Sequence, residues 1–171
     1  MTAYVALLRA VNVGGTGKLP MTELKAMCEA AGFDQVRTYI ASGNVVFTSD
    51  LDEDAVRAAI EKPLEAYAGK PVRVIVRTAA EMADTLARNP FPDRPGNRTV
   101  ALFIDGPIPP DAIDNARNVQ DEEMRLGERE IYIFYGDGMR DSRLTIPAGK
   151  AGTARNMNTV AKLAEMAAAL G

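Results

Sequence analysis

The sequence contains no histidine and no tryptophan, and its 171 residues include one cysteine, Cys28. Without histidine the chain cannot form a Ser-His-Asp or Cys-His catalytic group, and it cannot bind a metal through imidazole. Any general acid or base must therefore be a carboxylate, a lysine, a tyrosine or Cys28. A single cysteine also excludes a disulfide within the chain. Because Cys28 lies in a helical pattern at residues 21–31, we expect a buried and unreactive thiol.

Long apolar runs and a strong net charge are also missing. No stretch of 18 apolar residues occurs, so the sequence predicts no membrane span. Residues 1–9 lack the basic start and the cleavage site of a signal peptide, which favours a cytoplasmic location. The formal net charge of −3 gives no argument for a broad nucleic-acid surface.

The charges that are present are unevenly distributed. Residues 105–130 hold eight acidic and three basic side chains, whereas residues 138–162 hold five basic side chains and one acidic. A local basic zone on an otherwise acidic protein attracts small anions. The charge pattern therefore favours a small anionic ligand over long duplex DNA.

The first half of the chain alternates strand and helix patterns. Apolar runs at residues 4–9, 36–40, 45–48 and 72–76 predict strands, and apolar residues at helical spacing predict helices at 21–31 and 52–67. The resulting order, βαββαβ, is the ferredoxin-like pattern. We expect these four strands to form one mixed or antiparallel sheet with both helices on one face.

The second half repeats this order in part. A helix at 78–88 leads into a proline-rich linker at 89–98, followed by a strand at 99–104 and a short helix at 110–118. Hairpin strands at 123–126 and 131–135 and a helix at 157–170 follow, and no last strand is recognisable. The predicted fold class is α+β with two ferredoxin-like lobes in tandem, the second incomplete and followed by a C-terminal helix. The predicted divisions are a first lobe at 1–78, the connecting helix and linker at 79–98, and a second lobe at 99–171.

Three stretches resemble a known family. They are Tyr4-Val5-Ala6-Leu7-Leu8-Arg9-Ala10-Val11-Asn12-Val13-Gly14-Gly15, Val36-Arg37-Thr38-Tyr39-Ile40-Ala41-Ser42-Gly43-Asn44-Val45-Val46-Phe47, and Thr153-Ala154-Arg155-Asn156-Met157-Asn158-Thr159-Val160. Together they resemble DUF1697, a bacterial domain of unknown function, across essentially the whole chain. One departure is Met157, where the family commonly has tryptophan. The resemblance implies a two-lobed α/β fold and no particular activity.

The predicted topology brings two loops to one end of the first sheet. In a βαββαβ lobe, the loop after the first strand and the hairpin between the second and third strands leave the sheet at the same end. Backbone N–H groups of glycines and a following helix N-terminus suit a phosphate or carboxylate. The same glycines and asparagine are also what tight turns require, so a purely structural role stays open. The ligand-binding candidates of this half are Arg9, Asn12, Gly14, Gly15, Lys18, Ser42 and Asn44.

The second half adds Lys150, Arg155 and Asn156 as candidate ligand-binding residues. Thr153 or Asn156 also suits the N-cap of the last helix. An arginine at a helix start opposes the helix dipole, so we expect Arg155 to meet an anion or an acidic neighbour from residues 105–130. Asp121-Glu122-Glu123 is interpreted as a solvated turn, because adjacent strand residues point to opposite faces. No metal and no cofactor are predicted.

Three functions fit these observations. The leading hypothesis is a binding module for a small anionic ligand bearing a phosphate or carboxylate group, with a nucleotide or a short piece of nucleic acid included. The second is an enzyme that uses a lysine, tyrosine or carboxylate on a phosphorylated or carboxylated substrate. The third is a protein–protein adaptor that uses its open sheet faces. The sequence favours no particular oligomeric state and no membrane partner.

Overall fold

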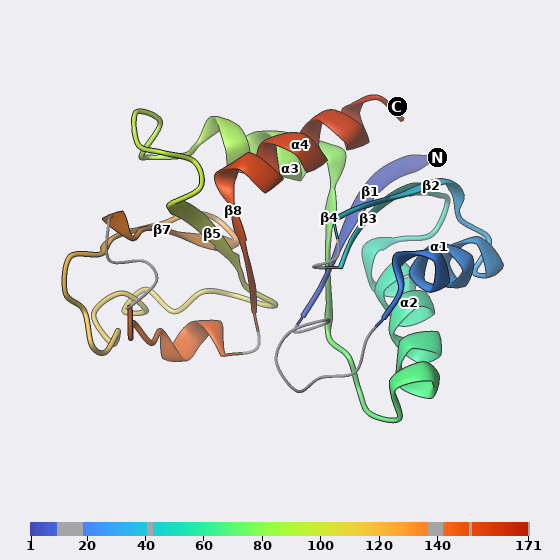
Figure 1. The fold of residues 1–171 in the computed structure, drawn as a ribbon, viewed down its shortest axis with the longest axis horizontal. Helices are drawn as coiled ribbons and strands as arrows, with labels where there is room; N and C mark the ends of the chain where they lie inside the picture. The colour runs from blue at the N-terminus through green and yellow to red at the C-terminus, as the bar shows by residue number, and fades with distance from the viewer. Residues whose placement is uncertain (10–18, 41–42, 137–141, 151, 171) are drawn as a thin grey trace. The chain divides into compact units, whose positions relative to one another are not determined.

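A computed structural model describes residues 1–9, 19–40, 43–136, 142–150 and 152–170 (Figure 1). In these residues the chain forms two four-stranded antiparallel sheets and four α-helices, an α+β fold. Two compact units result: a first lobe, Met1–Ala83 with Leu163–Gly171, and a second lobe, Asp84–Lys162. No helix among the described residues is long and apolar enough to cross a membrane.

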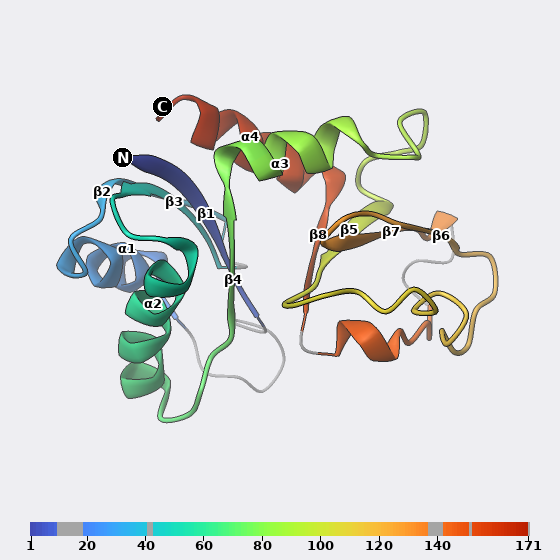
Figure 2. The same cartoon turned by 180° about the vertical axis from the view of Figure 1, so that it is seen from behind.

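The first sheet has the strand order β2-β3-β1-β4, and all neighbouring strands are antiparallel. Its elements along the chain are β1 (Thr2–Leu8), α1 (Met21–Ala30), β2 (Asp34–Tyr39), β3 (Asn44–Ser49), α2 (Glu53–Ala68) and β4 (Val74–Thr78). The prediction that these four strands share one sheet is confirmed. Figures 1 and 2, which view the protein from opposite sides, both show α1 and α2 on the same face of this sheet.

A core of alternating strand residues holds α1 and α2 on the first sheet. The buried members of this core are Tyr4, Ala6, Leu8, Val36, Val45, Phe47, Val74 and Val76 from the four strands, Leu24, Cys28, Val56, Ile60 and Leu64 from the two helices, and Leu19 and Phe33 from the adjoining segments. Spacings of three and four residues along each helix place its apolar side chains on one stripe. Asp52 caps α2 by accepting a hydrogen bond from the Ala55 N–H at 2.8 Å, and Gly69, at a φ of +73°, ends the helix.

The packing of Cys28 leads to a test of the first lobe. Its side chain is fully buried, and burial raises the pKa of the thiol to about 12. We therefore expect a thiol reagent to label the native protein slowly at pH 8, because only transient opening exposes Cys28 and little thiolate is present. The same protein in guanidinium chloride should react rapidly and stoichiometrically. Rapid labelling in native buffer would contradict the packing described here.

The second sheet repeats the strand order of the first. Its order is β6-β7-β5-β8, again antiparallel throughout, so β5 to β8 correspond in sequence to β1 to β4. The elements are α3 (Ala79–Ala87), β5 (Thr99–Phe103), β6 (Glu123–Leu126), β7 (Glu130–Phe134), the 3-10 turn η2 (Pro147–Gly149), β8 (Thr153–Asn156) and α4 (Met157–Ala168). The predicted hairpin and the predicted last helix are confirmed.

Two predictions for the second half are wrong. No last strand was recognisable in the sequence pattern, yet β8 completes the sheet beside β5. The buried positions of β8 are Thr153 and Arg155, and Ala154 between them is exposed. Buried and exposed positions therefore alternate as in an ordinary strand, but the buried side chains are polar, so the hydrophobic pattern of a strand is missing. The helix expected at 110–118 is a series of turns, with Arg117 bridged to Thr145. So short a segment beside several prolines does not sustain a helix by itself.

Candidate functional site

The candidate site is one end of the first sheet, which we call the Arg9 rim: Arg9 after β1, Gly43 before β3 and Arg73 before β4. The Leu8 N–H donates to the Gly43 carbonyl at 2.9 Å, and the Arg9 N–H donates to the Arg73 carbonyl at 2.9 Å. The chain after β1 and the turn before β3 therefore leave the sheet side by side, as the predicted topology requires.

Two arginines lie next to each other at this rim. Arg9 and Arg73 occupy opposed positions on neighbouring strands, because the register pairs Leu8 with Val74 and the backbone hydrogen bond continues it. Both residues are exposed, and neither forms an ion pair with another described residue. Like charges directly opposite each other destabilise a strand pair, and an anion between them removes that repulsion. Two guanidinium groups also suit the geometry of a phosphate or carboxylate.

Sequence reasoning missed Arg73. It precedes β4 in a connecting segment, and only the strand register brings it beside Arg9. Arg73 also lines a small pocket of about 150 Å³ with Glu61, Glu65, Pro71 and Val72. Glu61 in this pocket accepts a hydrogen bond from the Val74 N–H at 3.0 Å. The carboxylates of Glu61 and Glu65 repel an anion from this pocket. The favourable position for an anion is therefore between Arg73 and Arg9.

Asn44 has a structural role at the Arg9 rim. Its side chain is fully buried, and its Nδ2 donates to the Tyr39 carbonyl at 3.0 Å, which closes the turn between β2 and β3. Within that turn Ile40 has a φ of +50° and is half exposed, whereas Gly43 has a φ of +89°. Asn12, Gly14, Gly15, Lys18 and Ser42, the remaining candidates of the first half, lie outside the described residues, and their role stays a prediction.

The candidates of the second half lie in different environments. Lys150 is exposed at the end of η2. Asn156 caps α4, since its Oδ1 accepts a hydrogen bond from the Thr159 N–H at 2.9 Å, which confirms one of the two predicted caps. Arg155 belongs to β8 and precedes the helix, so the expectation of an arginine on the helix start is wrong.

Arg155 is held inside the second lobe. Its Nη1 donates to Thr153 Oγ1 at 2.7 Å and to the Ala154 carbonyl at 2.9 Å, and burial lowers the pKa of the guanidinium to about 10. The strand register gives Arg77 of β4 the equivalent place in the first lobe, where it is also buried and donates to the Val76 carbonyl at 3.0 Å. A buried arginine on the fourth strand is therefore a shared feature of both lobes.

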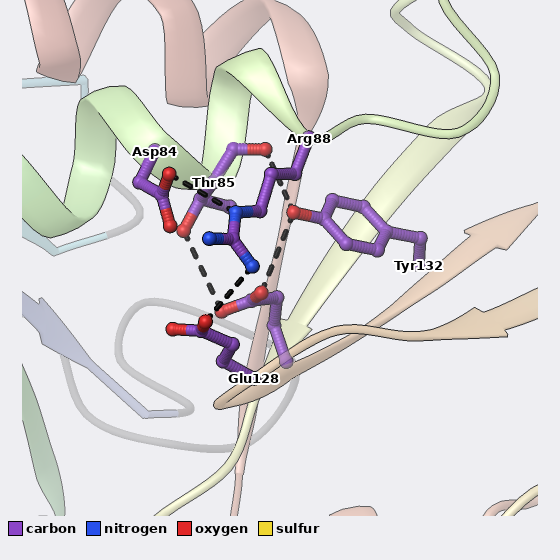
Figure 3. A network of polar contacts seen from close by, with 6 residues as sticks. Asp84, Thr85, Arg88, Glu128 and Tyr132 are labelled. Atoms are coloured by element: carbon purple, nitrogen blue, oxygen red, sulfur yellow. Dashed lines mark hydrogen bonds and ion pairs between the residues drawn. The ribbon is translucent and has the colours of Figure 1, made fainter.

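A further polar cluster joins α3 to the second sheet (Figure 3). The Tyr132 hydroxyl donates to the Thr85 carbonyl at 2.8 Å and lies 3.4 Å from the buried Glu130 carboxylate. Burial and the Glu130 charge raise the pKa of Tyr132, so the hydroxyl remains protonated as a donor. This contact fixes α3 to β7 and gives Tyr132 a structural role.

Arg88 extends the same cluster to the surface. Its guanidinium contacts Asp84 at 3.1 Å and Glu128 at 2.8 Å, and the three side chains meet beside Tyr132 in Figure 3. Because these side chains are about half exposed, the ion pairs contribute little to stability. No local pattern in the sequence indicates this cluster, because its members come from α3, from Arg88 just after it, and from the hairpin of β6 and β7.

The fold and site together define a class: an α+β protein with two antiparallel sheets of the same strand order and a basic rim on the first. The profile of the DUF1697 family, described as a protein of unknown function, matches residues 1–132, and the chain belongs to this family. No curated protein matches the chain.

A solved structure shows the same fold. It is described as the structure of the conserved bacterial protein SP0830 from Streptococcus pneumoniae, with a TM-score of 0.79 and 23% sequence identity. The similarity covers 97% of this chain and 98% of that chain, so it includes both lobes. At this identity the comparison supports the fold alone.

Proposed function

We propose that this protein is a binding module for a small anionic ligand bearing a phosphate or carboxylate group, and that the ligand binds at the Arg9 rim. The observation that carries the proposal is the opposed pair of exposed arginines, Arg9 and Arg73, at the ends of adjacent strands. A bound anion gains charge-assisted hydrogen bonds from both guanidinium groups.

We further propose that both lobes are ferredoxin-like. In support, each sheet has its first strand between the third and the fourth, and all strand neighbours are antiparallel. In this arrangement, the end of the first strand and the starts of the third and fourth strands lie at the same end of the sheet. In the first lobe these are the segments that carry Arg9, Gly43 and Arg73.

Replacing Arg9 or Arg73 by alanine tests the proposal. Each charge-assisted hydrogen bond contributes about 1.5–3 kcal/mol, so each variant should bind pyrophosphate roughly 10- to 150-fold more weakly than the wild type. The measurement is calorimetric titration at low ionic strength, where screening is weakest. The melting temperature without ligand should stay almost unchanged, because exposed charges contribute little to stability.

Arg117→Ala is the matched control. Arg117 is an exposed arginine of the second lobe, so its loss changes the net charge equally and should leave pyrophosphate affinity within about twofold. The proposal fails if neither pyrophosphate nor a carboxylate such as citrate binds the wild type. It also fails if Arg9→Ala lowers the melting temperature strongly while anion affinity is unaffected, because Arg9 would then have a structural role.

A further inference from the structure

The strand β6 is an edge of the second sheet. The strand order β6-β7-β5-β8 gives β6 a partner on one side, and no other described strand pairs with its outer side (Figure 2). Arg125 and Leu126 of this strand are exposed, and the apolar side chain of Leu126 is 43% exposed. An exposed edge offers unpaired N–H and C=O groups to a strand of another molecule. The residues of β6 therefore decide whether such a strand can pair with it.

The strand register identifies which backbone groups of β6 point outward. The Gly127 N–H donates to the Glu130 carbonyl at 2.7 Å, which makes these two residues a hydrogen-bonded pair at the hairpin. Hydrogen-bonded and non-hydrogen-bonded pairs alternate along antiparallel strands. Met124 and Leu126 therefore belong to non-hydrogen-bonded pairs with β7. Their N–H and C=O groups point away from β7, toward the outer side of the strand.

Arg125 covers one of these outward groups. Its Nη1 donates to the Met124 carbonyl at 2.7 Å, and its Cζ lies 5.9 Å from the centroid of the Phe91 ring. The hydrogen bond occupies the acceptor that an incoming strand would use, and the contact with the ring holds the guanidinium beside the edge. A second strand laid over this position would also remove water from the charge, which costs free energy.

The same contact occurs on two further edge strands. Arg77 of β4 donates to the Val76 carbonyl at 3.0 Å, and Arg155 of β8 donates to the Ala154 carbonyl at 2.9 Å. Both carbonyls belong to non-hydrogen-bonded pairs with β1 and β5, so they point outward as the Met124 carbonyl does. In three of the four edge strands of the described sheets, an arginine therefore binds the outward carbonyl of the residue before it.

Other outward groups on the edges of the first sheet are also occupied. The outward N–H groups of Val74 and Thr78 on β4 donate to the carboxylates of Glu61 and Glu81 at 3.0 and 2.9 Å. The remaining edge strand, β2, is interrupted by a register shift next to Gln35, which has a φ of +54°. Such a bulge hinders pairing with a further strand. Closure of the sheet edges is therefore a recurrent feature of this fold.

We propose that Arg125 closes the β6 edge against a second copy of this chain, and that its removal allows two β6 strands to pair antiparallel. A second copy is the partner because each molecule presents the same edge with the same exposed Leu126, and a twofold axis joins identical surfaces. The outward groups of Met124 and Leu126 would then exchange hydrogen bonds between the two copies. This inference does not depend on the proposed anion site, which belongs to the first lobe.

Arg125→Val tests the proposal, because valine favours strands and cannot bind the Met124 carbonyl. In sedimentation experiments on the whole protein at up to about 1 mM, where weak complexes are populated, the apparent mass of the variant should rise toward about twice the wild-type value. Hydrogen exchange at the Leu126 amide should slow as the concentration rises. Arg143→Val, at an exposed arginine of the second lobe outside the strands, is the matched control and should sediment as the wild type.

A second substitution distinguishes edge pairing from loss of folding. Leu126→Pro removes an outward N–H that β7 does not use, so the fold should be kept, and adding it to Arg125→Val should restore wild-type sedimentation. The proposal is overturned if Arg125→Val sediments as the wild type over this concentration range, or if association persists in the double variant. Association accompanied by loss of the circular dichroism signal also overturns it, because unfolded chains would then be the cause.

Discussion

Phe47→Ala should lower the free energy of unfolding of the first lobe by about 3–5 kcal/mol, the cost typical of removing a buried phenylalanine. Phe47 is fully buried in the middle of β3 and stacks on Phe33 with ring centroids 4.3 Å apart. It also contacts the ring of Tyr4, 6.0 Å away across the β1–β3 pair. Alanine would leave a cavity between the sheet and its helices that rigid strands cannot close.

The effect can be measured by urea unfolding, with circular dichroism and tyrosine fluorescence as signals. Phe47→Leu keeps most of the apolar volume and should cost only about 1.5 kcal/mol. Arg37→Ala, at an exposed position on the neighbouring strand, should change stability by less than about 0.5 kcal/mol. A loss below 1 kcal/mol for Phe47→Ala would show that this core is not packed as described.

Gly152→Val should separate β8 from β5 and destabilise the second lobe by more than 3 kcal/mol, beyond the usual range of about 1–3 kcal/mol for overpacking. A Cβ atom at Gly152 would collide with the Phe103 carbonyl oxygen. Rotation of a side chain cannot relieve this collision, because the contacted atom belongs to the backbone of β5. The strands would have to move apart at the point where Phe103 pairs with Thr153.

Ala154→Val is the matched control for this prediction. It adds the same kind of side chain two residues further along β8, at an exposed position, where a β-branched residue suits a strand. We expect it to be neutral or slightly stabilising. Thermal unfolding and hydrogen exchange at the β5 amides measure both variants, and a stable Gly152→Val protein with protected β5 amides would contradict the close strand contact.

The second lobe has the same strand order as the first, but its residues at the equivalent end of the sheet differ from those of the candidate site. The Ile104 N–H donates to the Arg129 carbonyl at 3.0 Å, the counterpart of the bond from Leu8 to Gly43 in the first lobe. The residue that follows is Asp105, where the first lobe has Arg9. A carboxylate at that position repels an anion, so the proposed function assigns ligand binding to the first lobe alone.

The sequence by itself determined the elements whose hydrophobic periodicity is strong. The strands of the first sheet, α1, α2, the β6–β7 hairpin and α4 follow from apolar residues that recur at strand or helix spacing. The βαββ order also predicted that the chain after β1 meets the turn before β3, because topology alone fixes which loops share an end of a sheet. Arg9 was identified as a candidate on that basis.

Only the tertiary structure decided the remaining features. It placed Arg73 beside Arg9 through the register of β1 and β4, which no local pattern encodes. It made a strand of residues 153–156, whose inward side chains are threonine and arginine, because β5 offers hydrogen bonds along its open edge. It also removed the helix expected at 110–118. Local propensity is weak in short polar or proline-containing segments, so packing and strand pairing set their structure.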